Sequence, residues 1–66
     1  LRDRLSAELE RLPERLRMTV LLHDVEGFTH REISGILDIP EGTSKARLFE
    51  ARARLREALA GVAMEQ

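Results

Sequence analysis

The side chains best suited to binding a ligand are those of the basic residues in the last third of the chain. They are Lys45, Arg47, Arg52, Arg54 and Arg56. Residues 43–66 carry these five and three Asp or Glu, a net charge of +2, while residues 1–42 carry six Lys or Arg and nine Asp or Glu, a net charge of −3. Basic side chains gathered on an otherwise acidic chain are suited to neutralising phosphates, so this segment is a candidate contact surface for nucleic acid. A solvated helix face without a ligand is the alternative that charge alone leaves open.

Helical geometry divides this basic segment into two faces. At about 100° per residue, one stripe must face a core, and it consists of Ser44, Leu48, Ala51, Leu55, Leu59 and Val62. The outward face has Thr43, Ala46 and Glu50 at its centre, Lys45, Phe49, Arg52 and Arg56 along one edge, and Arg47 and Arg54 along the other. Small residues let a helix approach base edges, Lys and Arg can reach guanine acceptors or phosphates, and Glu can accept from cytosine N4. The outward face therefore has the residue types that entry into a DNA groove requires.

The rest of the chain must position this face, and all of it has helical periodicity. Apolar residues recur at helical spacing in the first segment, at Leu1, Leu5, Leu9 and Leu12. Pro13 suits the first position of the next helix, whose stretch MTVLLHDV is apolar on most sides, as in a centrally packed helix. Gly27 can supply the left-handed residue that ends it. We expect one all-α domain over residues 1–66, without strands, with helices over about residues 1–11, 13–25, 30–37 and 41–60.

The third predicted helix has the clearest start signal. Thr29 followed by Glu32 forms a capping box, and Phe28 before it can pack on Ile33 as a hydrophobic staple. We expect the buried face of this helix to consist of Ile33, Ile36 and Leu37.

A tight turn separates this short helix from the basic one. Asp38 tolerates a left-handed backbone better than most residues that carry a side chain, and Pro40 can open the next helix. A short helix, a tight turn and a longer basic helix form a helix-turn-helix, here over residues 29–59. In that motif the second helix lies in the major groove of DNA.

Other classes of function receive little support from the sequence. Its 42% hydrophobic and 35% charged residues favour a folded domain over disorder, and it has no cysteine. No apolar run approaches the roughly 20 residues of a membrane span, so we expect no membrane insertion and a cytoplasmic location. The two histidines, His23 and His30, lie in different predicted elements without metal-ligand spacing, and nothing pairs a nucleophile with a base. We therefore expect no enzyme, no catalytic residue, no cofactor and no metal.

With these motifs in view, the chain resembles a known family. The run LLHDVEGFTHREISGILDIPEGTSKARLFEARARL is similar to domain four of bacterial RNA polymerase sigma factors, in particular the extracytoplasmic-function (ECF) group. D-V-E-G, T-H-R-E-I, L-D-I-P-E-G-T, K-A-R-L and A-R-A-R-L keep the family frame without a gap, and L-x-x-L-P-E-R-L-R resembles its upstream part. The resemblance implies a compact four-helix domain with a C-terminal helix-turn-helix, related to winged-helix folds but lacking the wing. With the start at Leu1, it also implies a segment of a longer sigma factor.

The resemblance implies promoter recognition in transcription initiation. Its partners would be double-stranded promoter DNA, bound at the minus-35 element by the last helix, the β flap of the RNA polymerase core, and an anti-sigma factor. The base-contacting positions of the family fall on Lys45, Ala46, Phe49 and Glu50. Its positions for contacts with the DNA backbone fall on His23, His30, Arg31, Thr43, Arg47 and Arg52.

Several residues depart from the family pattern. Glu50 stands where Arg is frequent, Ala46 where Ser is usual and His23 where Arg is frequent. Ser44 takes the place of a core Val, and Asp38 that of the turn Gly. The preferred DNA sequence should therefore differ from those of other members, and one phosphate contact becomes sensitive to pH or is lost.

Two other functions stay open at this point. A sigma-like decoy would keep the fold and bind an anti-sigma factor without reading DNA, as Glu50 and His23 would favour. The DNA-binding domain of LuxR-type regulators also has four helices, but the L-P start and the A-R-A-R-L end fit it less well.

Overall fold

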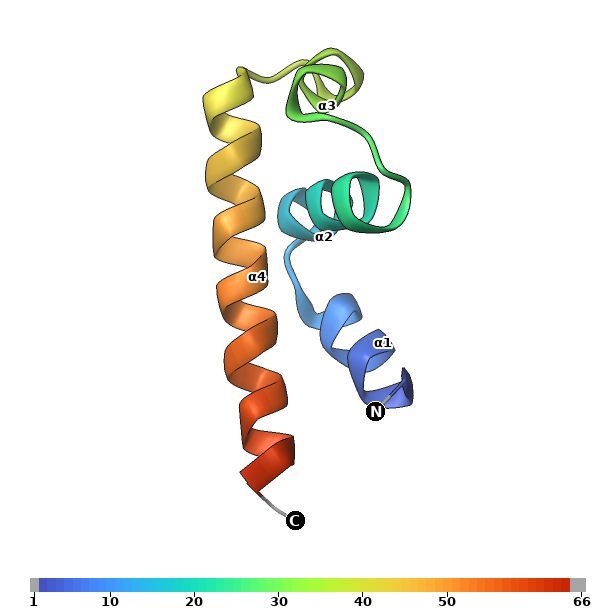
Figure 1. The fold of residues 1–66 in the computed structure, drawn as a ribbon, viewed down its shortest axis with the longest axis vertical. Coiled ribbons are helices and arrows are strands. Elements are labelled where there is room, and N and C mark those ends of the chain that lie inside the picture. The colour runs from blue at the N-terminus through green and yellow to red at the C-terminus, as the bar shows by residue number, and fades with distance from the viewer. Residues whose placement is uncertain (1, 65–66) are drawn as a thin grey trace.

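The computed structural model describes residues 2–64 of the chain, and the side chains within residues 3–61. Its elements are α1 (Arg2–Arg11), α2 (Glu14–Val20), the π-helix η1 (Leu21–Val25), α3 (His30–Leu37) and α4 (Glu41–Met64). No strand occurs among the described residues, and the predicted all-α class is confirmed. Figure 1 shows α4 as one long column with α1, α2 and α3 stacked along one side of it.

One apolar cluster joins the first two helices to α4. Its buried members are Leu12, Leu16, Val20, Leu48 and Ala51, with Leu9 and Leu55 packed at its edge. Fully burying a leucine side chain contributes roughly 1.5–3 kcal/mol, so this cluster supplies much of the driving force for so small a domain. The core sits behind the middle of α4.

The predicted inward stripe of α4 is confirmed where the structure describes it. Ser44, Leu48 and Ala51 are buried, and Leu55 and Leu59 are half-buried. Val62, and likewise Leu1 of the first predicted helix, lie outside the described side chains.

The predicted buried face of α3 is wrong at one position. Ile33 is fully buried and Leu37 half-buried, but Ile36 is 51% exposed. Ile33 and Leu37 lie about 40° apart around the helix axis, whereas Ile36 is displaced by about 60° to the other side of Ile33. Because α3 packs mainly on α4 and η1, its covered stripe is too narrow to include Ile36.

The second predicted helix is observed as two elements. α2 starts at Glu14, because Pro13 is the N-cap with extended backbone, and not the first helical residue as predicted. After Val20 the chain widens into η1, where the Glu26 N–H donates to the Leu21 carbonyl five residues earlier at 3.0 Å. Gly27, at φ 82°, then ends the helix in the left-handed conformation as predicted.

The capping box predicted at the start of α3 and the left-handed residue predicted after its end are both confirmed. Thr29 Oγ1 accepts from the Glu32 N–H at 3.1 Å, and Glu32 Oε1 accepts from the Thr29 N–H at 2.9 Å, which completes the capping box. Asp38 adopts φ 56° and ψ 53°, a left-handed turn residue that carries a side chain. α4 begins at Glu41, next to Pro40, and continues to Met64, beyond the predicted end near residue 60. The helix-turn-helix thus comprises α3, a turn at Asp38 and the first half of α4.

Candidate nucleic-acid interface

The N-terminal half of α4 presents an exposed face beside α3. Lys45 and Ala46 are exposed, and Phe49 is 74% exposed. An aromatic ring this open on a helix contributes nothing to the core and is available to stack on a ligand. Three of the four predicted base-contacting side chains therefore lie on one accessible surface.

Glu50, the fourth, is already engaged within the protein. Its Oε2 accepts from Arg54 Nη2 at 2.8 Å, one turn further along α4, and lies 3.9 Å from Arg15 Nη2 of α2. The Glu50 side chain keeps 44% of its surface exposed. A cytosine amino group would have to share this carboxylate with two arginines.

Arg52 is held on the other edge of α4 by a carboxylate from η1. Its Nε donates to Asp24 Oδ2 at 3.0 Å, and its Nη2 donates to Asp24 Oδ1. His23 Nδ1 lies 2.8 Å from the same Oδ1 and donates to it when protonated. The hydrogen bond from Arg52, helped by that from His23 and opposed by partial burial, lowers the pKa of Asp24 below its ordinary value. Asp24 therefore stays ionised and fixes the guanidinium of Arg52.

The two histidines meet, although they belong to different elements. Their rings stack with centroids 4.7 Å apart and planes at 23°. His30 Nδ1 also forms a 2.9 Å hydrogen bond with Ser44 Oγ, the buried hydroxyl in the inward stripe of α4. Desolvation, followed by the charges of His23, Lys45 and Arg52, lowers the pKa of His30, against a smaller opposite effect of Glu41.

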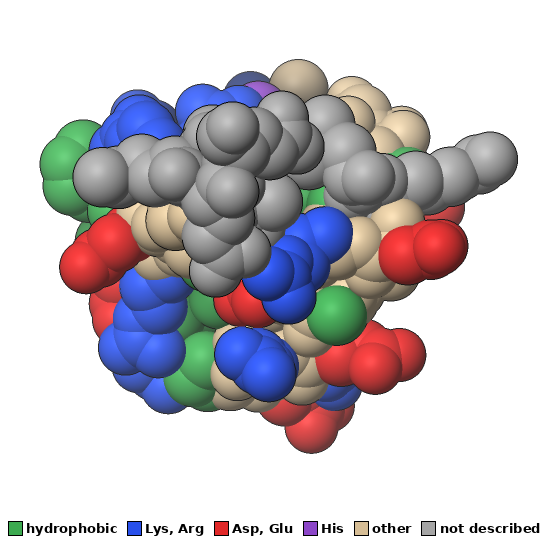
Figure 2. Space-filling view, turned by 90° about the horizontal axis from the view of Figure 1, so that it is seen from below, with side chains coloured by type: hydrophobic (Ala, Val, Ile, Leu, Met, Phe, Trp, Pro, Cys, Tyr) green, Lys and Arg blue, Asp and Glu red, His purple; other side chains and the backbone are tan. Residues whose placement is uncertain are grey.

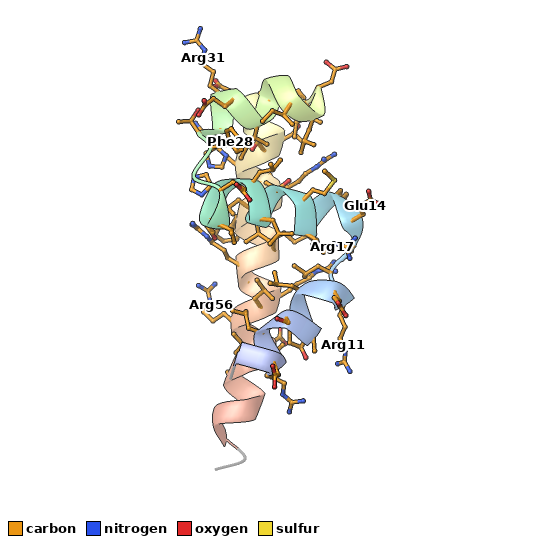
Figure 3. The ribbon with its side chains drawn as sticks, turned by 90° about the vertical axis from the view of Figure 1, so that its right-hand side faces the viewer. Arg11, Glu14, Arg17, Phe28, Arg31 and Arg56 are labelled. Atoms are coloured by element: carbon orange, nitrogen blue, oxygen red, sulfur yellow. The ribbon has the colours of Figure 1, made fainter. Side chains whose placement is uncertain are left out.

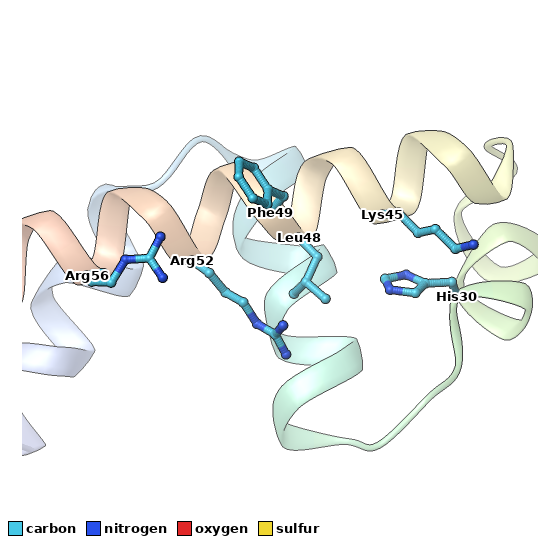
Figure 4. Close-up of a pocket in the computed structure, with 6 residues that line it drawn as sticks. All are labelled: His30, Lys45, Leu48, Phe49, Arg52 and Arg56. Atoms are coloured by element: carbon cyan, nitrogen blue, oxygen red, sulfur yellow. The ribbon is translucent and has the colours of Figure 1, made fainter.

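A basic hollow lies between the start of α3 and one edge of α4. Its volume is about 300 Å³, and it is lined by His30, Lys45, Leu48, Phe49, Arg52 and Arg56. Figure 4 shows Lys45, Arg52 and Arg56 projecting from one side of α4, with His30 reaching toward that side from α3. We call these six residues the basic hollow.

The remaining predicted backbone-contacting residues lie around this surface. Arg31 is exposed and points away from the body of the protein beyond α3 (Figure 3). Thr43 and Arg47 are half-buried on α4. The structure thus brings His23 and Arg52 together at Asp24, with His30 stacked on His23, while Arg31 stands apart at the tip of the domain.

The sequence did not predict the roles that three residues have at this interface, Asp24, Ser44 and Arg56. Asp24 holds Arg52 across 28 positions of sequence, a distance over which no local pattern gives a signal. Ser44 was assigned only to the inward stripe, yet it is a hydrogen-bond partner of His30. A hydroxyl in an otherwise apolar stripe was the available clue, because buried polar groups require partners. Arg56 was assigned to the edge without a role, and its spacing of four from Arg52 places both on one side of the helix.

Charge outside this interface is mixed. Figure 2 views the molecule from the C-terminal end of α4, and on the described residues visible there Lys and Arg side chains alternate with Asp and Glu. Within the part of the chain that the structure describes, none of the helices combines the length and the apolar character needed to cross a membrane.

Comparison with known proteins places these features in a family. The model of the sigma-70 region 4 family matches residues 2–55. The ECF RNA polymerase sigma-E factor of Escherichia coli (strain K12) is 42% identical over 52 residues, which are 79% of this chain and 27% of that protein. That of Haemophilus influenzae is 40% identical over 58 residues, 76% of this chain and 31% of that protein. The chain thus spans less than a third of the length of these relatives.

The match covers α1, α2, η1, α3 and α4 as far as Leu55, which are the elements that build the helix-turn-helix and its support. The chain therefore belongs to the family of sigma-70 region 4 domains.

Proposed function

We propose that this domain recognises promoter DNA at the minus-35 element, as part of an ECF-type sigma factor, by placing α4 in the major groove. The observation that carries the proposal is the exposed face of Lys45, Ala46 and Phe49 on the second helix of a helix-turn-helix. Around it, Arg31, His30 and Arg52 stand where phosphates would flank the groove. Phosphate contacts position such a domain, while base contacts specify its sequence.

The proposed assembly includes further partners. The named relatives are RNA polymerase sigma factors, which supports the polymerase core, through its β flap, as a partner of this chain. An anti-sigma factor is the second protein partner we propose. No catalytic step is assigned to the domain.

The first experiment is a selection of the folded domain against random DNA duplexes at low salt, followed by sequencing of the bound pool. We expect a short enriched motif, whose bases would then be tested against variants of the exposed face. Low salt is required because an isolated domain with a handful of phosphate contacts loses affinity steeply as salt rises.

The matched variants are Lys45→Glu and Arg11→Glu. Lys45 lies on the exposed face of α4, whereas Arg11 lies on α1, where it pairs with Glu8 at 3.5 Å and is widely exposed. Both variants change the net charge by −2. We expect Lys45→Glu to weaken binding by roughly tenfold or more, since it removes a contact worth about 1–3 kcal/mol, and Arg11→Glu by about twofold or less. Equal losses in a binding titration would show that only overall charge matters.

A decoy that binds an anti-sigma factor without reading DNA is the second candidate function. It is favoured by one observation: carboxylates of this chain already occupy Arg52 and Arg54, two of the basic residues of α4. A pool without enrichment, together with full binding of a protein partner by Lys45→Glu, would support the decoy over the promoter reader.

A further inference from the structure

The basic hollow has a charge that suits a phosphate group. Three cationic side chains of α4 and one imidazole of α3 line it, and no carboxylate is among the lining residues. Leu48, which is buried, forms an apolar wall, and Phe49, which is open to solvent, stands at the rim. A phosphodiester could sit among the cations while its deoxyribose lies against the Phe49 ring.

Arg52 is prepared for such a ligand by its ion pair. Asp24 uses Nε and one N–H of Nη2, and a guanidinium has five N–H donors in total. The unused donors remain for a phosphate, and the side chain is already ordered. Ordering in advance reduces the entropy lost when the ligand binds.

His30 is the group in the hollow whose charge can change near neutral pH. Its Nδ1 is taken by Ser44 Oγ at 2.9 Å, which leaves Nε2 as the ring nitrogen for a ligand. A hydroxyl both donates and accepts. Ser44 can therefore donate to Nδ1 of the neutral ring or accept from Nδ1–H of the charged ring, and it keeps this hydrogen bond in both states.

The surroundings of His30 in the free domain disfavour its charged form. From η1, His23 stacks on its ring, and Asp24 carries the charge next to His23. From α4, Lys45 and Arg52 oppose a further positive charge, and Glu41 favours one weakly. Together with desolvation, these groups lower the pKa of His30. A phosphate in the basic hollow would reverse this balance, because an opposite charge at close range favours the charged form.

We propose that the basic hollow binds one backbone phosphate of duplex DNA and that His30 takes up a proton as that phosphate enters. The inference rests on the proposed function and adds a linkage between DNA affinity and pH. The stacked pair, the Ser44 hydrogen bond and the basic lining are the three observations that carry it.

The test measures the affinity of the domain for its selected duplex between pH 7.5 and pH 6.0 at constant ionic strength. We expect binding to tighten by about three- to tenfold, since the logarithm of the affinity can change by at most one per pH unit for one proton. His30→Gln should bind more weakly than the parent at pH 6.0 and show less than a twofold change over the range. His23→Gln removes the stacked ring but leaves the Ser44 hydrogen bond and the basic lining in place, so it should keep a pH dependence of the same sign.

Proton uptake is measured directly by calorimetry in two buffers of different ionisation enthalpy. We expect up to one proton taken up per complex near pH 6.5 by the parent and none by His30→Gln. Binding without uptake, or uptake that survives in His30→Gln, would overturn the inference. Absence of binding at every pH would instead overturn the proposed function, so the two failures are distinguishable.

A chemical scan of the DNA locates the phosphate. Single phosphates of the selected duplex are replaced in turn by uncharged methylphosphonates. We expect one position at which replacement removes the pH dependence of the parent domain. A pH dependence that survives every replacement would place the proton elsewhere and refute the assignment.

Discussion

At the scale of single residues, the interface is arranged as two arginines restrained by two carboxylates. Asp24 holds Arg52 on one edge of α4, and Glu50 holds Arg54 on the other. Each pair is substantially exposed, so its contribution to stability is small and reduced by salt. The pairs act mainly on orientation and charge: they fix where the guanidinium groups point and moderate the positive field that meets DNA.

Removing the negative charge of Asp24 should therefore strengthen general DNA binding. We expect Asp24→Asn to bind a duplex of arbitrary sequence about two- to threefold more tightly at low salt, because a carboxylate near phosphates repels them modestly through water. Titrations at several salt concentrations measure this. The control is Asp3→Asn, which makes the same charge change at an exposed position of α1. Weaker binding of Asp24→Asn than of the control would show that ordering of Arg52 outweighs the repulsion.

At the scale of elements, the turns on either side of α3 set how it faces α4. The turn before α3 uses Gly27 at φ 82°, and the turn after it uses Asp38 at φ 56°. Between them, Gly35 lies in the exposed interior of α3, where an added Cβ would meet nothing within 4 Å. Gly27 thus has a positive φ that favours glycine, whereas Gly35 has an ordinary helical backbone in which alanine is favoured.

Alanine at these two positions should have opposite effects. Gly35→Ala should raise the free energy of unfolding by roughly 0.5–1 kcal/mol, the cost of glycine inside a helix. Gly27→Ala should lower it by about 1 kcal/mol or more, because its strain comes from the positive φ alone and not from a clash. Urea unfolding of both variants and the parent gives the comparison. A destabilised Gly35→Ala would mean that α3 is strained in a way that its open surface does not reveal.

The turns and helices around α3 show which structural features could be predicted from the sequence and which could not. The capping box at Thr29 and the left-handed residues Gly27 and Asp38 were predictable, because each depends on local backbone chemistry. The widening of the second helix into η1 was not, since its residues satisfy an ordinary helix equally well. The contact of Asp24 with Arg52 and the stacking of the histidines depend on that widening and on long-range packing. Hence the exposed face of α4 was predicted, and the ion pairs that restrain its arginines were not.

At the scale of the whole molecule, stability should fall in acid in two stages. His30 has a pKa below its ordinary 6.5 in the folded domain, so the unfolded chain takes up that proton first and stability declines as pH falls below about 6.5. Asp24 has a pKa below its ordinary 3.8, so its contribution is present above that pH and is lost as pH falls through its folded value. Both groups therefore favour the folded state at neutral pH.

Thermal unfolding at pH 7.5, 5.5 and 2.5 checks this order, because the contribution of Asp24 is lost only below its ordinary pKa of 3.8. We expect the parent to lose stability at each step, His30→Gln to lose less in the first step, and Asp24→Asn to lose less in acid. A parent domain that becomes more stable between pH 7.5 and pH 5.5 would contradict the direction given for His30.

The continuity of α4 has a mechanical consequence. Its exposed residues, which we propose contact DNA, and its core-facing residues belong to one unbroken helix, so Phe49 and Leu55, about 9 Å apart along the axis, are rigidly coupled. Leu55 also lines an apolar recess with Leu5, Leu9, Val20 and Leu21. A contact that tilts α4 at Leu55 therefore also displaces the end that carries Lys45. The buried Leu48 and Ala51 lie near the pivot of this tilt.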